Sequence, residues 1–91
     1  MSDVTQHSET DIDILIVDDE AAVRRSLERI LRSAGYACEQ AKSVSDAIEV
    51  LESRTVKLVL SDIRMPRRSG LELVDYVSDL HPETVIVSVI S

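Results

Sequence analysis

The most constraining feature of this sequence is a pair of largely apolar runs that each end in carboxylates. Residues 12–17 are apolar at every position but one, and three acidic residues follow at 18–20. Residues 56–60 form a second such run, and Asp62 follows it. Runs of this kind are typical of strands covered on both faces, as in a parallel sheet. Pro66 lacks an N–H and has a fixed φ, so we expect Asp62 at the C-terminal tip of a strand, where a loop begins.

Three amphipathic segments separate the strands and indicate helices. The first begins after residue 20, where acidic side chains suit the partly positive helix N-terminus, and Gly35 stands where a helix C′ residue belongs. The second begins at Ser43 or Ser45, and the third at Ser69, which matches a capping box with Glu72. The apolar residues at three- and four-residue spacing are expected to face the core. They are Val23, Leu27, Ile30, Leu31 and Ala34 in the first helix, Val44, Ala47, Ile48 and Leu51 in the second, and Leu71, Val74, Val77 and Leu80 in the third.

Two further strands complete the order βαβαβαβ. Residues 36–41 are the more polar, which predicts a place near a sheet edge, and residues 85–90 form a last apolar strand. Strands that alternate with helices of 10–15 residues indicate an α/β fold with a parallel sheet and right-handed crossovers. Residues 1–11 are polar and without a period, so we expect a flexible tail there and a single domain over residues 12–91.

Composition excludes several classes of function. The net charge is −7 over 91 residues, which argues against direct nucleic-acid binding. No apolar run approaches the 20 or so residues of a membrane span, and no secretory signal is present. The single cysteine, Cys38, cannot form an internal disulfide, so a cytoplasmic location and a small buried apolar role are expected. His7 and His81 are isolated and do not indicate a metal site.

The two acidic clusters predict a shared site. The C-terminal ends of parallel strands meet at one sheet edge, where open α/β sheets bind ligands. We therefore expect the carboxylates of Asp18, Asp19 and Asp62 to share one divalent cation and one phosphoryl group. Mg²⁺ prefers hard oxygen ligands and is usually held by one or two carboxylates. Carboxylates this close repel one another, so at least one pKa should be raised when metal is absent.

The strand-end clusters resemble those of the receiver domain of two-component response regulators. The resemblance is carried by residues 14–20 (Ile-Leu-Ile-Val-Asp-Asp-Glu), by residues 62–66 (Asp-Ile-Arg-Met-Pro), by Gly70 and by the helix end at His81-Pro82. Each piece alone is a weak signal. Two acidic clusters, each at a strand end and with two βα units between them, are specific.

This resemblance implies a flavodoxin-like, doubly wound sheet of order 2-1-3-4. It implies that Asp62 accepts a phosphoryl group from a sensor histidine kinase or a phosphotransfer protein. It also implies that Mg²⁺ is bound directly by Asp19, Asp62 and the backbone carbonyl of Arg64, with Asp18 acting partly through water. Such a domain is a signalling element that phosphorylates itself from a donor, not an enzyme with its own turnover. Its output domain lies outside this chain, and a homodimer is left open.

Near its C-terminus the sequence departs from the family pattern. Receivers continue into a fifth strand, which ends in a lysine that pairs with the phosphoryl group, and a fifth helix. We expect this fifth βα unit to be missing from the chain, and neither Lys42 nor Lys57 lies at the lysine's position. The hydroxyl that receivers place at the end of the fourth strand falls at Ile90 or Ser91. Ser91 is therefore the candidate, and Ser88, in mid-strand, is a poorer one. A bare edge strand would favour aggregation.

Other readings compete with phosphoacceptance. The absent lysine is compatible with a receiver-like interaction module that does not phosphorylate. A Mg²⁺-dependent phosphohydrolase would need a second aspartate two residues after Asp62, where Arg64 stands. A dinucleotide-binding domain is disfavoured because no Gly-rich phosphate motif occurs. In the plainest reading, Asp18 and Asp19 only cap a helix and Asp62 only begins a turn.

Overall fold

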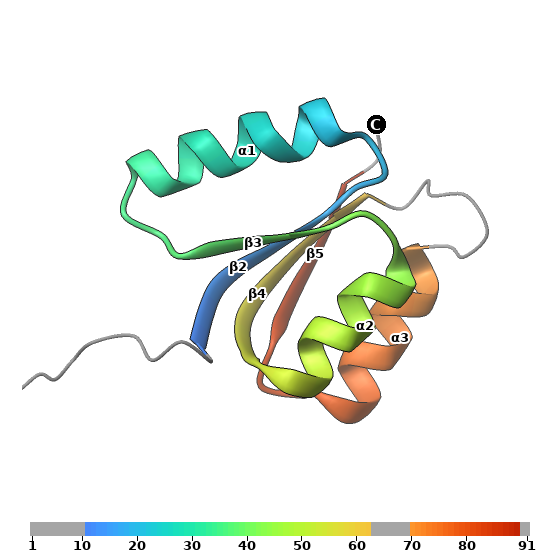
Figure 1. Ribbon diagram of the computed structural model, residues 1–91. Helices are drawn as coiled ribbons and strands as arrows, with labels where there is room; N and C mark the ends of the chain where they lie inside the picture. Colours follow the sequence, from blue (N-terminus) through green and yellow to red (C-terminus); the bar gives the residue numbers. More distant parts are fainter. Residues whose placement is uncertain (1–10, 63–69, 90–91) are drawn as a thin grey trace, which may run out of the picture.

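A parallel β-sheet lies between two layers of helices in the computed structural model, which describes residues 11–62 and 70–89 (Figure 1). The elements in chain order are β2 (Asp11–Val17), α1 (Ala21–Ser33), β3 (Cys38–Ala41), α2 (Val44–Ser53), β4 (Thr55–Asp62), α3 (Gly70–Leu80) and β5 (Val85–Val89). α1 covers one face of the sheet, and α2 and α3 cover the other. The predicted α/β architecture is confirmed.

The sheet has the order β3-β2-β4-β5, and every pairing is parallel. Counted along the chain this is the expected order 2-1-3-4, with the more polar strand β3 at an edge as predicted. β2 begins at Asp11, one residue earlier than predicted, and the rest of the predicted tail lies outside the described residues. In the β2–β4 register Val17 pairs with Ser61. The next residues, Asp18 and Asp62, therefore emerge side by side at the C-terminal edge.

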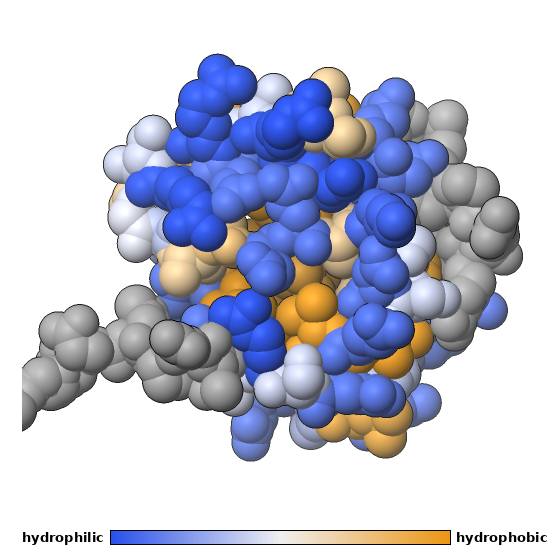
Figure 2. All heavy atoms as spheres, viewed as in Figure 1, coloured by the Kyte–Doolittle hydropathy of each residue, from blue (hydrophilic) through white to orange (hydrophobic). Residues whose placement is uncertain are grey.

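Most of the buried apolar side chains lie between the sheet and the α2–α3 layer. This core consists of Ile12, Leu15, Val17, Ala41, Val44, Ala47, Leu51, Val56, Val59, Leu73 and Val77. A smaller cluster on the α1 side contains Ile14, Ile16 and Cys38, and Leu27 and Leu31 of α1 pack against it. Cys38 is buried, as predicted. Figure 2 shows the same side of the molecule, with hydrophilic residues gathered over α1.

The predicted inner face of α1 is partly wrong. Leu27 and Leu31 pack against the sheet, whereas Ile30 is 64% exposed and Ala34, the C-cap, is also exposed. Successive helical residues are about 100° apart, so a helix that turns Leu27 and Leu31 inward points Ile30 elsewhere. Apolar spacing alone placed Ile30 on the inner face of the helix, because steps of three and of four residues were treated as equivalent.

A similar error affects α3. Leu71 and Leu80, expected in the core, are 57% and 63% exposed, whereas Leu73 and Val77 are buried. The apolar residues of this helix lie on two overlapping stripes. The stripe that faces the core contains Leu73 and Val77, which are four residues apart. Ser69, the predicted N-cap, lies outside the described residues.

The ends of α1 and α2 follow the capping predictions. Gly35 has a φ of +100°, and the N–H groups of Gly35 and Tyr36 donate to carbonyls of the last turn of α1 at 2.9 and 3.1 Å. This is the Schellman arrangement, which favours glycine at C′. Ser43 rather than Ser45 is the N-cap of α2, because its Oγ accepts from the N–H of Asp46 at 3.1 Å.

β5 forms the second edge of the sheet among the described residues. Val85, Val87 and Val89 alternate along it and are each more than two-fifths exposed, and Ile86 points to the α2–α3 core. The predicted strand is confirmed, but one face of it is not covered by the described residues. Within residues 11–62 and 70–89, none of the helices is long and apolar enough to cross a bilayer.

Candidate phosphoacceptor and metal site

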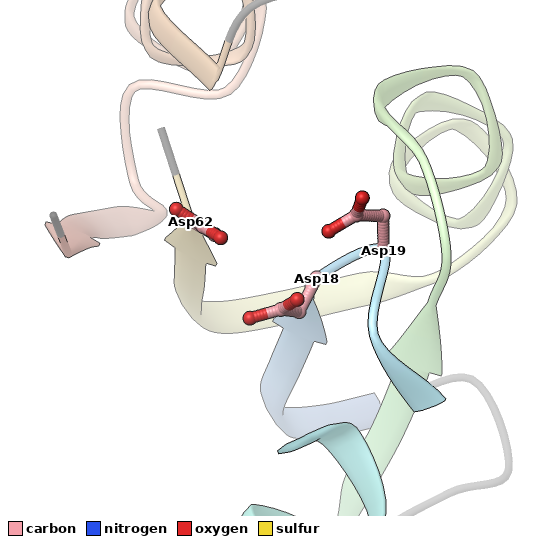
Figure 3. A group of neighbouring side chains, drawn as sticks. All are labelled: Asp18, Asp19 and Asp62. Atoms are coloured by element: carbon pink, nitrogen blue, oxygen red, sulfur yellow. The ribbon is translucent and has the colours of Figure 1, made fainter. Parts of the chain in front are cut away.

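Three carboxylates converge at the C-terminal edge of the sheet. Asp62 is the last residue of β4, Asp18 follows β2 directly, and Asp19 lies on the connection to α1 (Figure 3). One carboxylate oxygen from each residue lies within 4.8 Å of those of the other two. The predicted convergence of residues 18, 19 and 62 is confirmed. It follows from the β2–β4 register, because two adjacent parallel strands end at the same level.

The three side chains differ in burial. Asp18 and Asp62 are each 8% exposed, and Asp19 is exposed. Carboxylate oxygens from two sheltered residues and one accessible residue fit a hard divalent cation that keeps part of its water shell, as Mg²⁺ does. Asp62 is the member that ends a strand, and it faces the space between the other two carboxylates (Figure 3).

Hydrogen bonds to both neighbouring segments hold Asp18. Its N–H donates to the carbonyl of Ala41 at 3.1 Å, which extends the β2–β3 pairing by one residue, and its Oδ1 accepts from the N–H of Glu20 at 2.9 Å. Burial raises the pKa of Asp18 above its ordinary value, the hydrogen bond from Glu20 opposes this shift, and the charges of Asp62 and Asp19 add to the increase. The predicted raised pKa is present, but desolvation contributes more to it than repulsion.

Two polar residues beside the site were missed in the sequence. Ser61 is 1% exposed, and its Oγ donates to the carbonyl of Asp62 at 3.2 Å. Arg24, whose charge is typical of a solvent-facing helix residue, donates through Nη1 to the main-chain carbonyl of Asp18 at 2.7 Å. The feature of the sequence that could have identified Arg24 is its position, one turn into α1 and on the side of the acidic loop.

An apolar cleft adjoins the carboxylates. It has a volume of about 190 Å³ and lies between α1 and the ends of β4 and β5, with Val23, Leu27 and Val89 among its lining residues beside Asp18 and Asp62. A larger hollow of about 690 Å³ lies at the opposite end of the sheet. That hollow lacks the acidic cluster, so the site chemistry belongs to the strand-end carboxylates.

The other candidate residues comprise two that the structure does not describe and two that it places outside the carboxylate cluster. Arg64 and Ser91 lie outside the described residues. Ser88 lies within β5 and pairs with Ser61, one residue short of the level of Asp62. Lys57 forms an ion pair with Asp13, with Nζ 3.3 Å from Oδ1, and is not part of the carboxylate cluster.

The comparisons with known proteins agree with this geometry. The profile of the response regulator receiver domain matches residues 14–91. The chain is 36% identical over 74 residues to the DNA-binding transcriptional regulator NtrC of Escherichia coli K12, covering 81% of this chain and 16% of NtrC. It is 38% identical over 88 residues to the sensor histidine kinase RcsC of Salmonella typhimurium, covering 97% of this chain and 9% of RcsC.

A solved structure shows the same likeness. The response regulator protein TrrA of Thermotoga maritima, in complex with Mg²⁺ and BeF, superposes with a TM-score of 0.82 at 32% identity, covering 87% of this chain and 69% of TrrA. The chain thus spans less than a fifth of NtrC and of RcsC and about two thirds of TrrA. The profile match, the sheet order and the converging carboxylates lead to one conclusion: this chain belongs to the response regulator receiver domain family.

Proposed function

We propose that this receiver domain accepts a phosphoryl group on Asp62, with Mg²⁺ held by the carboxylates of Asp18, Asp19 and Asp62. The observation that carries the proposal is the convergence of the three carboxylates within 4.8 Å at the C-terminal edge of the sheet. The similarity to TrrA, which was solved with Mg²⁺ and BeF, supports the choice of metal and ligand. The donor in this proposal is a sensor histidine kinase or a phosphotransfer protein.

The chemistry is a single displacement at phosphorus. A carboxylate oxygen of Asp62 attacks the phosphorus atom of the donor, the bond from phosphorus to the leaving group breaks, and the leaving group keeps the electron pair. Bound Mg²⁺ would supply positive charge beside the transferring oxygens. Asp62 lies at the end of β4 and is 8% exposed, so little solvent reaches the nucleophile.

Several finer expectations belong to the same proposal. The backbone carbonyl of Arg64 is a further metal ligand, and Ser91 is the hydroxyl that contacts the phosphoryl group. The phosphoryl group stays on the chain, so we propose a signalling domain without turnover of a free substrate. A cytoplasmic location and a protein partner, rather than nucleic acid, fit the net charge of −7 and the free thiol of Cys38.

Phosphorylation from acetyl phosphate tests the proposal. We expect the wild-type chain to incorporate one phosphoryl group when Mg²⁺ is present and none after removal of the metal with a chelator. Asp62→Asn should abolish incorporation, because the amide is not a nucleophile. Asp75→Asn is the matched control, since Asp75 is an exposed carboxylate on α3, and it should label as the wild type does. Intact-mass spectrometry reads the added phosphoryl group directly.

Labelling that persists in Asp62→Asn would exclude Asp62 as the acceptor. A wild-type chain that binds Mg²⁺ but never labels from any donor would favour an interaction module instead.

A further inference from the structure

The side chain of Arg24 ties α1 to the loop that carries two of the three carboxylates. Its Nη1 donates to the main-chain carbonyl of Asp18 at 2.7 Å, and its Nε donates to Oε1 of Gln40 at 3.0 Å. In the described part of the chain, both hydrogen bonds of this guanidinium therefore go to uncharged oxygens. Arg24 is close to the acidic cluster without occupying a carboxylate oxygen that a cation would need.

The Asp18–Glu20 connection is otherwise held by hydrogen bonds that main-chain N–H groups donate. The N–H of Asp18 donates to Ala41, the N–H of Glu20 donates to Oδ1 of Asp18, and the N–H of Arg24 donates to the carbonyl of Glu20 at 3.1 Å in the first turn of α1. The guanidinium adds a tie from within the helix to the carbonyl of Asp18 itself. Removing it leaves a part-buried carbonyl without this donor.

Arg24 is in turn held by a row of polar side chains along α1 and β3. Gln40, which accepts from Arg24, donates through Nε2 to Oε1 of Glu28, and the other oxygen of Glu28 accepts from Nε of Arg32. Arg32 also donates to the carbonyl of Cys38 at 2.8 Å. Charge-assisted bonds at both ends of such a row restrict the rotamers of its members. The guanidinium is thus fixed before any cation arrives.

We propose that Arg24 is a positioning residue for metal binding. By holding the main chain of Asp18, it keeps the carboxylates of Asp18 and Asp19 aimed at Asp62. This inference rests on the proposed Mg²⁺ site.

The direction of the change in Mg²⁺ affinity distinguishes a positioning role of Arg24 from an effect of its charge. A guanidinium near a cation site repels the cation, so loss of its charge alone would tighten Mg²⁺ binding. Loss of positioning would weaken Mg²⁺ binding, because residues that orient metal ligands contribute about 10- to 100-fold in affinity. The two effects have opposite signs, and the direction of the change identifies the role.

Arg24→Met and Arg25→Met form the test pair. Both remove one positive charge from adjacent positions of α1, but Arg25 is exposed. We expect Arg24→Met to weaken Mg²⁺ binding by roughly tenfold, the lower end of the range for such residues, and Arg25→Met to leave it unchanged or slightly tighter. Titration with Mg²⁺ alone, followed by backbone amide chemical shifts, gives the dissociation constants. Arg24→Lys should recover most of the affinity, because the ammonium can still donate to the carbonyl of Asp18.

A second readout requires no metal. In metal-free protein, the Glu20 amide should exchange with solvent faster in Arg24→Met than in Arg25→Met, because the acceptor of its hydrogen bond is no longer held in place. If Arg24→Met does not fold, Gln40→Met replaces it, because it removes the acceptor of Nε of Arg24. It should weaken Mg²⁺ binding less than tenfold and hasten the same exchange.

Equal or tighter Mg²⁺ binding in Arg24→Met, with unchanged Glu20 exchange, overturns the positioning role while the proposed site stands. If the wild-type chain binds no Mg²⁺, the proposed function fails and the inference fails with it. Normal binding by the wild type is thus the reference that separates the two failures.

Discussion

At the scale of single residues, the fold holds Asp18 through both its main chain and its side chain. Its N–H pairs with β3, its carbonyl accepts from Arg24, and its Oδ1 accepts from Glu20. It is also 8% exposed, and desolvation raises its pKa more than the charges of Asp62 and Asp19 do. A buried carboxylate in a like-charged cluster destabilises the metal-free fold, which is a usual compromise at functional sites.

The raised pKa predicts a pH-dependent gain in stability for Asp18→Asn. The folded-state pKa lies above the ordinary value of 3.8, so the folded chain binds the proton more tightly than the unfolded chain does. Stability is then retained below pH 3.8 and lost as the pH rises through the folded pKa. Without metal at pH 7, Asp18→Asn should therefore unfold at a higher urea concentration than the wild type. The difference should shrink toward pH 3.8.

Added Mg²⁺ should reverse this order. A cation that binds only the folded chain stabilises it by about 2.7 kcal/mol at a hundred times its dissociation constant, and Asp18→Asn lacks one carboxylate ligand. Asp75→Asn, on the exposed face of α3, should follow the wild type under both conditions. A lower urea midpoint for Asp18→Asn than for the wild type in metal-free buffer at pH 7 would contradict this account.

At the scale of elements, burial divides the helices more sharply than their apolar patterns do. α2 and α3 bury Leu51, Leu73 and Val77 against the sheet, whereas α1 has no fully buried residue and packs through partly buried leucines. The difference follows from the sheet. α2 and α3 share one face with most of the core, and α1 lies alone on the other among the described residues.

Leu73→Ala and Leu80→Ala test this division with the same substitution on one helix. Leu73 is fully buried and Leu80 is 63% exposed. We expect Leu73→Ala to reduce the free energy of unfolding by about 2–5 kcal/mol, through lost burial and the cavity left behind. Leu80→Ala should change it by about 0.5 kcal/mol or less, as is usual at exposed sites. Urea unfolding of the two variants gives both values, and comparable losses would show that the α3 stripe is wrongly assigned.

At the scale of the whole molecule, the two sheet edges are unequal. β3 is four residues long and includes Glu39 and Gln40, features that discourage strand pairing between molecules. β5 exposes Val85, Val87 and Val89, and in the described part of the chain its outer side forms no pairing. An apolar edge of this kind is a template for association, although the net charge of −7 opposes it.

We therefore predict concentration-dependent self-association of the 91-residue chain through β5. Val87→Lys should shift the chain toward monomer, because a lysine on an edge strand is costly to bury in a second sheet. Leu80→Lys is the control, since it adds the same charge and removes a more exposed apolar residue outside the sheet. Sedimentation velocity over a range of concentrations measures the association. An equal shift in both variants would indicate a general effect of charge.

The convergence of the three carboxylates could be predicted because its signals are local in sequence. An apolar run followed by an aspartate indicates a strand end, and parallel strands place their ends at one edge whatever packs around them. Gly35 was predicted for the same reason, and Ser43 was one of two candidate caps, since a cap depends on its own turn. The connection rules predicted a parallel sheet, and the likeness to receivers supplied the order of its strands.

Features that depend on neighbouring elements could not be obtained this way. Whether Ile30 or Leu31 faces the sheet depends on how α1 is rotated, and apolar spacing tolerates both. Arg24 carries a charge, which is typical of a solvent-facing helix residue. Only the packing of α1 beside β3 brings its guanidinium to Asp18 and Gln40. The sequence by itself determined the carboxylate cluster, because strand ends follow from local patterns and the strand order follows from the likeness to receivers. The tertiary structure alone decided the burial of Asp18 and the role of Arg24, because desolvation and long-range hydrogen bonds exist only once the layers have packed.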